Sequence, residues 1–263
     1  MRIVHIVLPG ASEYEKKSQR IDAQVLGRDH EVVLAAALRD VPSADAAQIY
    51  GPSPALPLHS IPVIATAVPR RRFGFRRPAV ILVSPVKRDG FEYLPEAVEE
   101  LWFDPAVPPP AAGGGVRRTI GSFLRPSIVP FVEQTVVRLN RTREDIEWLL
   151  LDHAPTPAEM DSFAAWVDPA EEEDDFDGFV AEALVAGRTV IASRTPINAQ
   201  RLEKGRTGFL VPLHDANELS HAILAALFKT EVAQQRIEAA RQTVSKFRPR
   251  QRIRVLAHML EIL

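Results

Sequence analysis

The sequence predicts an α/β protein built from two doubly wound domains, each a parallel sheet with helices on both faces. Short apolar segments of strand length alternate with longer helical patterns along the chain. This alternation stops at three consecutive prolines, which small residues follow, and then resumes. A chain of 263 residues also fits two domains of modest size better than one.

Composition and charge narrow the class of protein. Hydrophobic residues make up 46% of the chain and charged residues 25%, which is ordinary for a globular protein. The 32 basic and 34 acidic side chains give a net charge of −2, so no overall positive field favours a nucleic-acid partner. The absence of cysteine excludes disulfide bonds and thiolate chemistry and is typical of a reducing compartment. We therefore expect a cytoplasmic protein. Because no apolar stretch approaches the ~20 residues of a membrane span, we expect it to be soluble or peripheral to a membrane.

Residues 1–110 form the predicted first domain. Residues 13–26 have a helical pattern, and short apolar runs predict buried strands. The expected strands are residues 3–8, 31–36, 46–50, 62–68 and 79–84. Most of them are bounded by Pro or Gly, which end regular structure. The prolines at 108–110 and the small residues after them then predict an interdomain linker over residues 111–118.

Residues 119–248 form the predicted second domain. Its expected strands are residues 119–123, 146–151, 164–167 and 189–193. Ser127 is expected to cap a helix, and Gly187 to end a helix over residues 179–186. An Asp-x-x-Glu capping box predicts the start of a further helix at Asp215.

The chain ends in helical patterns over residues 231–246 and 250–263. In the second of these, apolar side chains recur with helical spacing; they are Ile253, Leu256, Leu260 and Leu263. A stripe of this size is unfavourable when it faces water, so we expect residues 249–263 to pack on another part of the protein.

A stretch of the second domain resembles a known protein family. It reads E-A-L-V-A-G-R-T-V-I-A-S over residues 182–193, then E-K-G-R-T-G-F-L-V-P over residues 203–212 and D-A-N-E-L over residues 215–219. It resembles the donor-binding domain of retaining glycosyltransferases of the GT-B fold (group 1, family 4-like). Those enzymes read approximately E-A-L-A-x-G-x-P-V-V-A-S, E-x-G-x-T-G-x-L-V-P and D-x-x-x-L, in the same order and with the same spacing.

The resemblance extends more weakly over nearly the whole chain. Gly10 stands where the family has a glycine-rich turn after its first strand, and three later segments are similar to family segments; these are residues 30–32, 81–84 and 94–105. The resemblance implies two Rossmann-like domains, with the acceptor in the first and a nucleotide-sugar donor in the second. It also implies a last helix that crosses back to the first domain.

The catalytic residues that the resemblance implies are Asp174 and Glu182, which correspond to the family's E-x7-E pair. Glu182 would accept hydrogen bonds from the donor ribose, and Asp174 would face the sugar. A structural alternative exists for Asp174, because it is one of six acids between Glu171 and Asp177. Acids at that place favour a helix N-terminus through the helix dipole.

The resemblance also implies a set of donor-binding residues: Gly10, Ser122, Arg125, Thr195, Pro196 and Ile197. Ser122 and Ser127 stand where the family has the Arg and Lys that neutralise the donor diphosphate, which leaves Arg125 as the nearest cation. Residues 195–197 follow a strand at the carboxyl edge of the predicted sheet, where open α/β folds bind ligands. An ordinary helix start with proline explains them equally well.

Two further features of the sequence bear on how the donor would be held. Six carboxylates beside a diphosphate would repel it, so either a divalent cation bridges them or most of them point away. No His and Asp cluster has the spacing of a protein metal site, so no dedicated metal site is expected. The chain between Asp152 and Phe163 is also shorter than in the family, where a further βα unit helps to hold the nucleotide base.

The only concentrated basic run extends from Arg70 to Arg77 and holds five arginines with two phenylalanines between them. Three interpretations stay open: a solvated loop, a weak contact with an anionic membrane surface, or a contact with a charged acceptor. The membrane contact would place a cytoplasmic protein at the inner membrane face.

Taken with the resemblance, the sequence predicts a glycosyltransferase that moves a hexose from a nucleotide sugar to an unidentified acceptor with retention of configuration. Two alternatives stay open. The missing diphosphate clamp suggests a GT-B-shaped binding module without catalysis. A nucleotide-sugar epimerase that shares the fold is the other.

Overall fold

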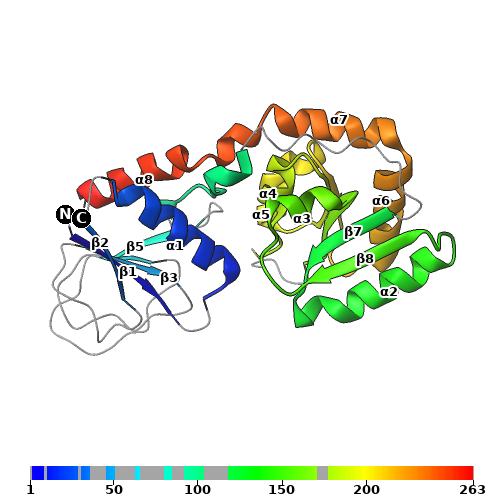
Figure 1. Ribbon diagram of the computed structural model, residues 1–263, viewed down its shortest axis with the longest axis horizontal. Coiled ribbons are helices and arrows are strands. Elements are labelled where there is room, and N and C mark those ends of the chain that lie inside the picture. The colour runs from blue at the N-terminus through cyan, green and yellow to red at the C-terminus, as the bar shows by residue number, and fades with distance from the viewer. Residues whose placement is uncertain are drawn as a thin grey trace. The chain divides into compact units, whose positions relative to one another are not determined.

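The computed structural model describes residues 2–8, 11–28, 31–35, 46–50, 63–65, 80–84, 92–103, 118–170 and 177–262. The chain separates into two compact units (Figure 1). Unit 1 comprises Met1–Val98 together with Phe247–Leu263, and unit 2 comprises Glu99–Lys246. Of the segment predicted as a linker, only Arg118 lies within the described residues, and it begins a strand.

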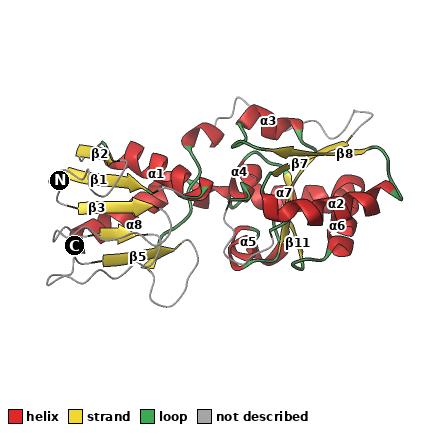
Figure 2. Cartoon of the chain, turned by 90° about the horizontal axis from the view of Figure 1, so that it is seen from below, coloured by secondary structure: helices red, strands yellow, loops and turns green. Residues whose placement is uncertain are grey.

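Unit 1 is an α/β unit with a parallel sheet, as predicted. Within its described residues the sheet has six strands in the order β2-β1-β3-β4-β5-β6. They are β1 (Arg2–Val7), β2 (Glu31–Ala35), β3 (Ala46–Tyr50), β4 (Val63–Ala65), β5 (Val80–Ser84) and β6 (Glu92–Tyr93). Every pair of neighbouring strands is parallel, and the arrows of β1, β2, β3 and β5 point the same way in Figure 2.

Helix α1 (Glu13–Leu26) covers this sheet and has the bounds that the sequence predicts. Its start is fixed by a capping box in which the Ser12 side chain accepts from the Glu15 backbone N–H, and the Glu15 carboxylate accepts from the Ser12 N–H. Two of the orphan N–H groups of the first turn are satisfied in this way. The sequence pattern therefore locates this helix well.

The last helix, α8 (Pro249–Ile262), packs on unit 1, which confirms the predicted return of the chain to the first domain. It lies beside α1 (Figure 1). Leu256, Met259 and Leu260 are buried against a cluster that includes Ile3, Leu26 and Leu94. Of the other two members of the expected stripe, Ile253 is only half-buried and Leu263 lies outside the described residues. Met259 is buried as well, because it lies one turn from Leu256 on the same face.

Unit 2 is the second α/β unit. Its described residues form a parallel sheet of five strands in the order β11-β10-β9-β7-β8. These strands are β7 (Arg118–Phe123), β8 (Ile146–Leu151), β9 (Ala165–Asp168), β10 (Thr189–Ser193) and β11 (Phe209–Val211). The helices are α2 (Val129–Asn140), α3 (Pro157–Ser162), α4 (Val180–Val185), α5 (Pro196–Arg201), α6 (Ala216–Phe228) and α7 (Thr230–Arg241). Short 3₁₀ turns are Glu100–Phe103, Pro126–Ile128, Glu203–Gly205 and Val244–Phe247.

The predicted helix cap at Ser127 is wrong. Pro126 begins a 3₁₀ turn, Pro126–Ile128, which leads directly into α2. The residue that precedes α2 is therefore Ile128, whose side chain makes no capping hydrogen bond. By contrast, the predicted cap at Asp215 is confirmed, because its carboxylate accepts from the N–H groups of two residues in the first turn of α6.

The sequence does not predict α3, although its start carries a clear signal. Thr156 and Glu159 form a capping box, and Pro157 occupies the first helical position. This short helix is the connection between β8 and β9, and β8 is an edge strand of the described sheet. The short segment noted in the sequence thus leaves β8 without an outer neighbour among the described strands.

The centre of the unit 2 sheet is closely packed around Trp166 on β9, which is fully buried. A Cβ atom at Gly121 on β7 would lie 2.8 Å from the ring atoms of both Phe163 and Trp166. Only glycine fits at this position, because the two rings approach the β7 backbone. None of the described helices is long and apolar enough to cross a membrane.

Candidate functional site

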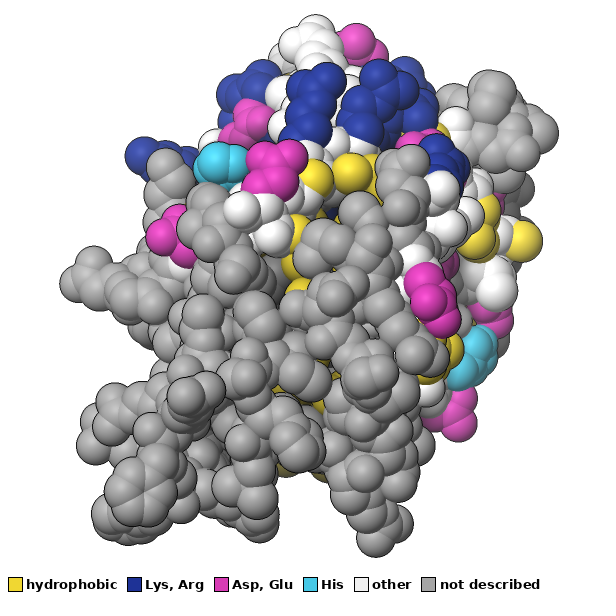
Figure 3. All heavy atoms as spheres, turned by 90° about the vertical axis from the view of Figure 1, so that its left-hand side faces the viewer, with side chains coloured by type: hydrophobic (Ala, Val, Ile, Leu, Met, Phe, Trp, Pro, Cys, Tyr) yellow, Lys and Arg dark blue, Asp and Glu magenta, His cyan; other side chains and the backbone are white. Residues whose placement is uncertain are grey.

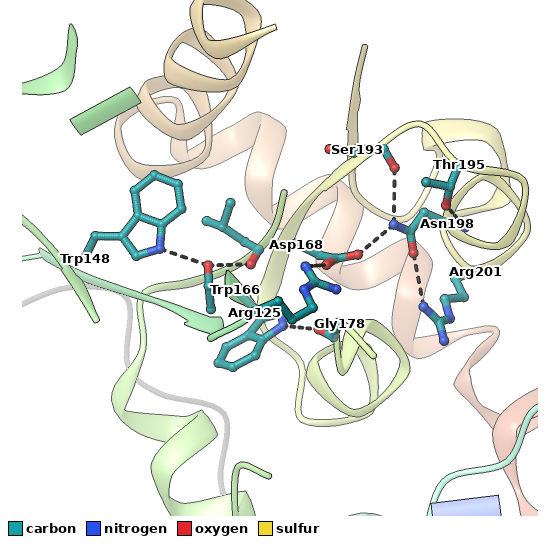
Figure 4. A network of polar contacts seen from close by, with 11 residues as sticks. Arg125, Trp148, Trp166, Asp168, Gly178, Ser193, Thr195, Asn198 and Arg201 are labelled. Carbon is teal, nitrogen blue, oxygen red and sulfur yellow. Dashed lines mark hydrogen bonds and ion pairs between the residues drawn. The ribbon is translucent and has the colours of Figure 1, made fainter. Parts of the chain in front are cut away.

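The candidate site lies at the carboxyl edge of the unit 2 sheet. Because all five described strands are parallel, their carboxyl ends share one edge, and open α/β sheets bind ligands there. Arg125 follows β7, Asp168 ends β9, and Thr195 and Asn198 follow β10. Figure 4 shows these side chains joined in a network of polar contacts.

Asp168 is at the centre of this network. Its Oδ1 accepts from Nη2 of Arg125 at 2.7 Å, and its Oδ2 accepts from Nδ2 of Asn198 at 2.7 Å (Figure 4). The side chain of Asp168 is 0% exposed and that of Arg125 is 11% exposed. A buried carboxylate is costly unless charge and hydrogen bonds compensate it, and here both of its oxygens are engaged.

The segment that leads into α4 packs directly on Asp168. A Cβ atom at Gly178 would lie 2.2 Å from the Asp168 carboxyl carbon, so a larger residue there would displace the Asp168 side chain. The Gly178 carbonyl accepts from Nε1 of Trp166 at 2.6 Å, which fixes this approach (Figure 4). Asp168 therefore touches segments that follow β7, β9 and β10.

The residues predicted to bind the donor after β10 form the start of α5. Thr195 is its N-cap, since its hydroxyl accepts from the Asn198 N–H at 3.2 Å, and Pro196 is the first helical residue. Ile197 is fully buried in the core, while Pro196 is exposed. The Asn198 amide also donates to the Ser193 carbonyl at 3.2 Å, and its oxygen accepts from Arg201 at 3.2 Å. This helix start is held rigidly against Asp168.

Ser122, the first of the two serines at the family's cation positions, is built into the sheet. It is fully buried, and its hydroxyl donates to the Val167 carbonyl at 2.6 Å and accepts from Nε1 of Trp148 at 2.9 Å. Ser127, at the second position, is exposed in the 3₁₀ turn before α2. Arg125 is the cation between them in sequence that reaches Asp168.

Glu182 lies in the first turn of α4 and is 2% exposed. It belongs to the helix whose entry packs on Asp168, so it shares this part of unit 2 with Arg125 and Asn198. Two further predicted residues, Asp174 and Gly10, lie outside the described residues. The structure thus brings Arg125 and the residues of α5 together through Asp168.

The sequence does not predict Asp168 as a site residue. The only signal for it in the sequence is that a charged residue ends an apolar run, directly before Pro169.

A second polar cluster follows β8 at the same edge of the sheet. His153 contacts Asp152 through Nδ1 at 3.0 Å and Glu159 through Nε2 at 2.8 Å. These hydrogen bonds raise the pKa of His153 above its usual value. The pKa of Glu159 is lowered to about 2, first by the backbone hydrogen bond from Thr156 and then by His153. The cluster is exposed to solvent, and its contacts fix the start of α3.

Two further expectations from the sequence concern metal binding and the basic run from Arg70 to Arg77. Among the described residues, no group of three or more His, Asp or Glu side chains is arranged to hold a metal ion. The basic run from Arg70 to Arg77 lies outside the described residues. On the face of the molecule drawn in Figure 3, the Lys and Arg side chains of the described part gather in the upper region with Asp and Glu between them. The membrane contact stays a prediction.

The chain has two α/β units, each with a parallel sheet, and its last helix belongs to the first unit. This architecture is the GT-B fold, which glycosyltransferases of known structure share. A model of the family Glycosyl transferases group 1 matches residues 77–228, which is more than half of the chain. The chain belongs to this family.

Solved structures of glycosyltransferases share the fold over almost the whole chain. A glycosyltransferase from Rickettsia africae ESF-5 has a TM-score of 0.69 at 12% identity and covers 99% of this chain and 97% of its own. Anabaena Alr3699/HepE in complex with UDP-glucose has a TM-score of 0.68 at 12% identity, with 100% of both chains covered. WaaG, a glycosyltransferase involved in lipopolysaccharide biosynthesis, has a TM-score of 0.60 at 10% identity and covers 92% and 95%. No curated protein sequence matches the chain.

Proposed function

We propose that this protein transfers a hexose from a nucleotide-sugar donor to an acceptor with retention of configuration, and that the donor binds at the carboxyl edge of the unit 2 sheet. Membership of the glycosyltransferase family supports transfer of a sugar. One observation carries the position of the donor: Arg125 is held at the end of β9 by Asp168. This cation follows the same strand as the family's missing clamp residues.

The proposed chemistry depends on charge and positioning. A nucleotide-sugar donor loses a nucleoside diphosphate, so negative charge develops on the leaving phosphate. The guanidinium of Arg125 would stabilise that charge in a largely buried place, where the interaction is stronger than in water. Glu182 would hold the donor ribose, and Asp174 would face the sugar, as the resemblance implies. A divalent cation at the diphosphate is an open part of the proposal.

The nucleotide base is the least constrained part of the donor. Among the described strands, β8 is at the edge of the sheet, and only α3 connects it to β9. The family's further βα unit, which helps to hold the base, is therefore not formed by the segment 152–163. A uridine donor is the first to test, because Anabaena Alr3699/HepE has been solved with UDP and with UDP-glucose.

The test is a calorimetric titration with UDP, GDP and ADP in parallel, followed by assays for sugar transfer from the matching nucleotide sugars. The variant Arg125→Gln is expected to weaken the best nucleoside diphosphate about tenfold, because a charge-assisted hydrogen bond is lost. Arg141→Gln is the matched control, since Arg141 is exposed just after α2, a helix that runs away from the carboxyl edge. If no nucleoside diphosphate binds at millimolar concentration, the proposal is wrong.

A second candidate function is a binding module of the same fold without catalysis. The observation that favours it is Ser122, which is fully buried and makes two hydrogen bonds inside the sheet at a position where the family has a cation. Such a module would bind a nucleotide or a partner but release no nucleoside diphosphate from any nucleotide sugar. Binding without turnover, measured with the three donors and a range of acceptors, would favour this candidate over the enzyme.

We also propose that the protein is cytoplasmic and that the run from Arg70 to Arg77 contacts anionic lipid weakly. Basic side chains near an anionic surface contribute about 1 kcal/mol each, and salt screens them. Sedimentation with phosphatidylserine vesicles at low salt is expected to retain some protein, and pure phosphatidylcholine none. Replacement of the five arginines by glutamine should abolish the difference; no sedimentation even at low salt contradicts the proposal.

A further inference from the structure

The backbone of Arg125 does not by itself fix where its guanidinium lies. It lies in an extended conformation two residues beyond the end of β7, with φ −129° and ψ 135°. A long arginine side chain on such a loop has many rotamers, and fixing one of them costs affinity when a ligand binds. A contact that fixes the side chain beforehand removes that cost.

Asp168 provides such a contact, and it is itself fixed from behind. Its second oxygen accepts from Asn198, which is held in turn by Thr195, Ser193 and Arg201 (Figure 4). On the other side, the entry to α4 packs against Asp168, because Gly178 approaches the carboxylate closely. The carboxylate is thus a rigid anchor at the end of β9.

In the pair of Arg125 and Asp168, the arginine is the more exposed side chain. The Asp168 side chain is 0% exposed, whereas the Arg125 side chain is 11% exposed. An approaching anion therefore meets the guanidinium before the carboxylate. A guanidinium presents several N–H donors in one plane, so it can hold a carboxylate and a phosphate at once.

We infer that Asp168 is a positioning residue that holds Arg125 ready for the diphosphate of the donor. This inference rests on the proposed function and adds to it a residue that none of the family-like motifs includes. Asp168 acts through Arg125, so its removal should affect ligands with a diphosphate and spare those without one.

The experiment is a double-mutant cycle on nucleotide binding. Asp168→Ala and Arg125→Gln are made singly and together, and UDP and uridine are titrated by calorimetry. Asp168→Ala is expected to weaken UDP about tenfold while uridine changes by less than about twofold. In the Arg125→Gln background, Asp168→Ala should have no further effect on UDP, because the residue through which it acts is gone.

Asp22→Ala is the matched control for loss of stability. Asp22 is also a buried aspartate that pairs with an arginine, but it lies in unit 1 and outside all predicted site residues. It should lower the melting temperature without changing the affinity for UDP, when binding is measured well below every melting temperature. If Asp168→Ala does not fold, Asp168→Asn replaces it, because it keeps the volume and removes the charge.

The outcomes separate the inference from the proposed function. A loss confined to UDP, and absent in the Arg125→Gln background, supports the positioning role. An equal loss for UDP and uridine, or a loss that persists with Arg125→Gln, overturns it and makes Asp168 a purely structural residue. UDP binding that is insensitive to Arg125→Gln also overturns it but leaves the proposed function with other ligands. A parent protein that binds no nucleoside diphosphate overturns both.

Discussion

Each unit contains a buried aspartate that forms an ion pair with an arginine. The differences between the two pairs suit one to stabilising the fold and the other to binding a ligand. In unit 1, Asp22 of α1 and Arg252 of α8 meet through two bonds of 2.7 and 2.8 Å, and both side chains are at most 2% exposed. In unit 2, Asp168 and Arg125 meet through one bond of 2.7 Å, and the arginine is partly exposed.

The surroundings of the two pairs differ as well. Asp22 lies on a helix and also accepts from Gln48 at 2.9 Å and Tyr50 at 2.8 Å, so four donors surround it. Burial alone would lower the pKa of Arg252, but the charge and hydrogen bonds of Asp22 raise it above its usual value. A closed pair of this kind fixes α8 to α1. Within the described part of the chain Asp168 has two donors, and it lies at a strand end, where an arginine can face a ligand.

The largest expected effect is the loss of the unit 1 arginine. Arg252→Met leaves the Asp22 carboxylate buried without its charge partner, which costs about 3–5 kcal/mol of the free energy of unfolding. Arg125→Met should cost less, about 1–3 kcal/mol, because its site is more open to water. Chemical denaturation of both variants measures the difference. Equal losses would mean that the unit 2 pair is as structural as the unit 1 pair.

The second expected effect concerns pH and unit 1 alone. His5 on β1 is fully buried, and burial lowers its pKa from 6.5 to about 4, against the opposing charge of Asp22. Between pH 6.5 and 4, His5 is therefore protonated in the unfolded chain and neutral in the folded protein. This contribution is fully present above pH 6.5 and is lost as the pH falls towards 4, by about 3 kcal/mol in total.

The variant His5→Phe tests this assignment, because it keeps a ring against Tyr50 and removes the titration. The stability of the parent should fall more steeply than that of the variant between pH 6.5 and 4, as measured by urea unfolding at several pH values. His153→Gln is the control: its pKa is raised and it is exposed, so it should leave the slope in this range almost unchanged. Identical slopes for parent and His5→Phe would contradict the prediction.

Local patterns predict the elements of this fold well where their signals lie within a few residues. The bounds of α1, β3, β8 and β10 agree with the apolar runs and caps in the sequence. The cap at Ser127 is wrong because a proline one residue earlier begins a 3₁₀ turn, and α3 was missed although its capping box is present. The error at Ser127 arises because two local signals compete within one turn of chain.

The site was less predictable than the fold, for a physical reason. Arg125 and Asp168 are 43 residues apart, and Asp22 and Arg252 are 230 apart. No periodicity connects partners at such separations; only the strand order brings their elements together. The resemblance located the loop that holds Arg125, but it described Ser122 as a ligand position, whereas that side chain is committed to the interior of the sheet. The partner that fixes Arg125 lies in none of the matched motifs.

The smallest expected effect distinguishes the two aspartates by their secondary donors. Gln48→Ala removes one of four donors to Asp22, and the hydrogen bonds from Arg252 and Tyr50 remain. The free energy of unfolding should therefore fall by about 0.5–1.5 kcal/mol. Asn198→Ala removes one of the two donors that Asp168 has among the described residues, the one to its Oδ2, so it should cost about 1–3 kcal/mol. Parallel urea titrations of the two variants at one pH measure the difference. If Gln48→Ala costs as much as Asn198→Ala, the number of donors does not decide how firmly each carboxylate is held. The rigid anchoring of Asp168 through Asn198 would then need another cause, such as the close approach of Gly178.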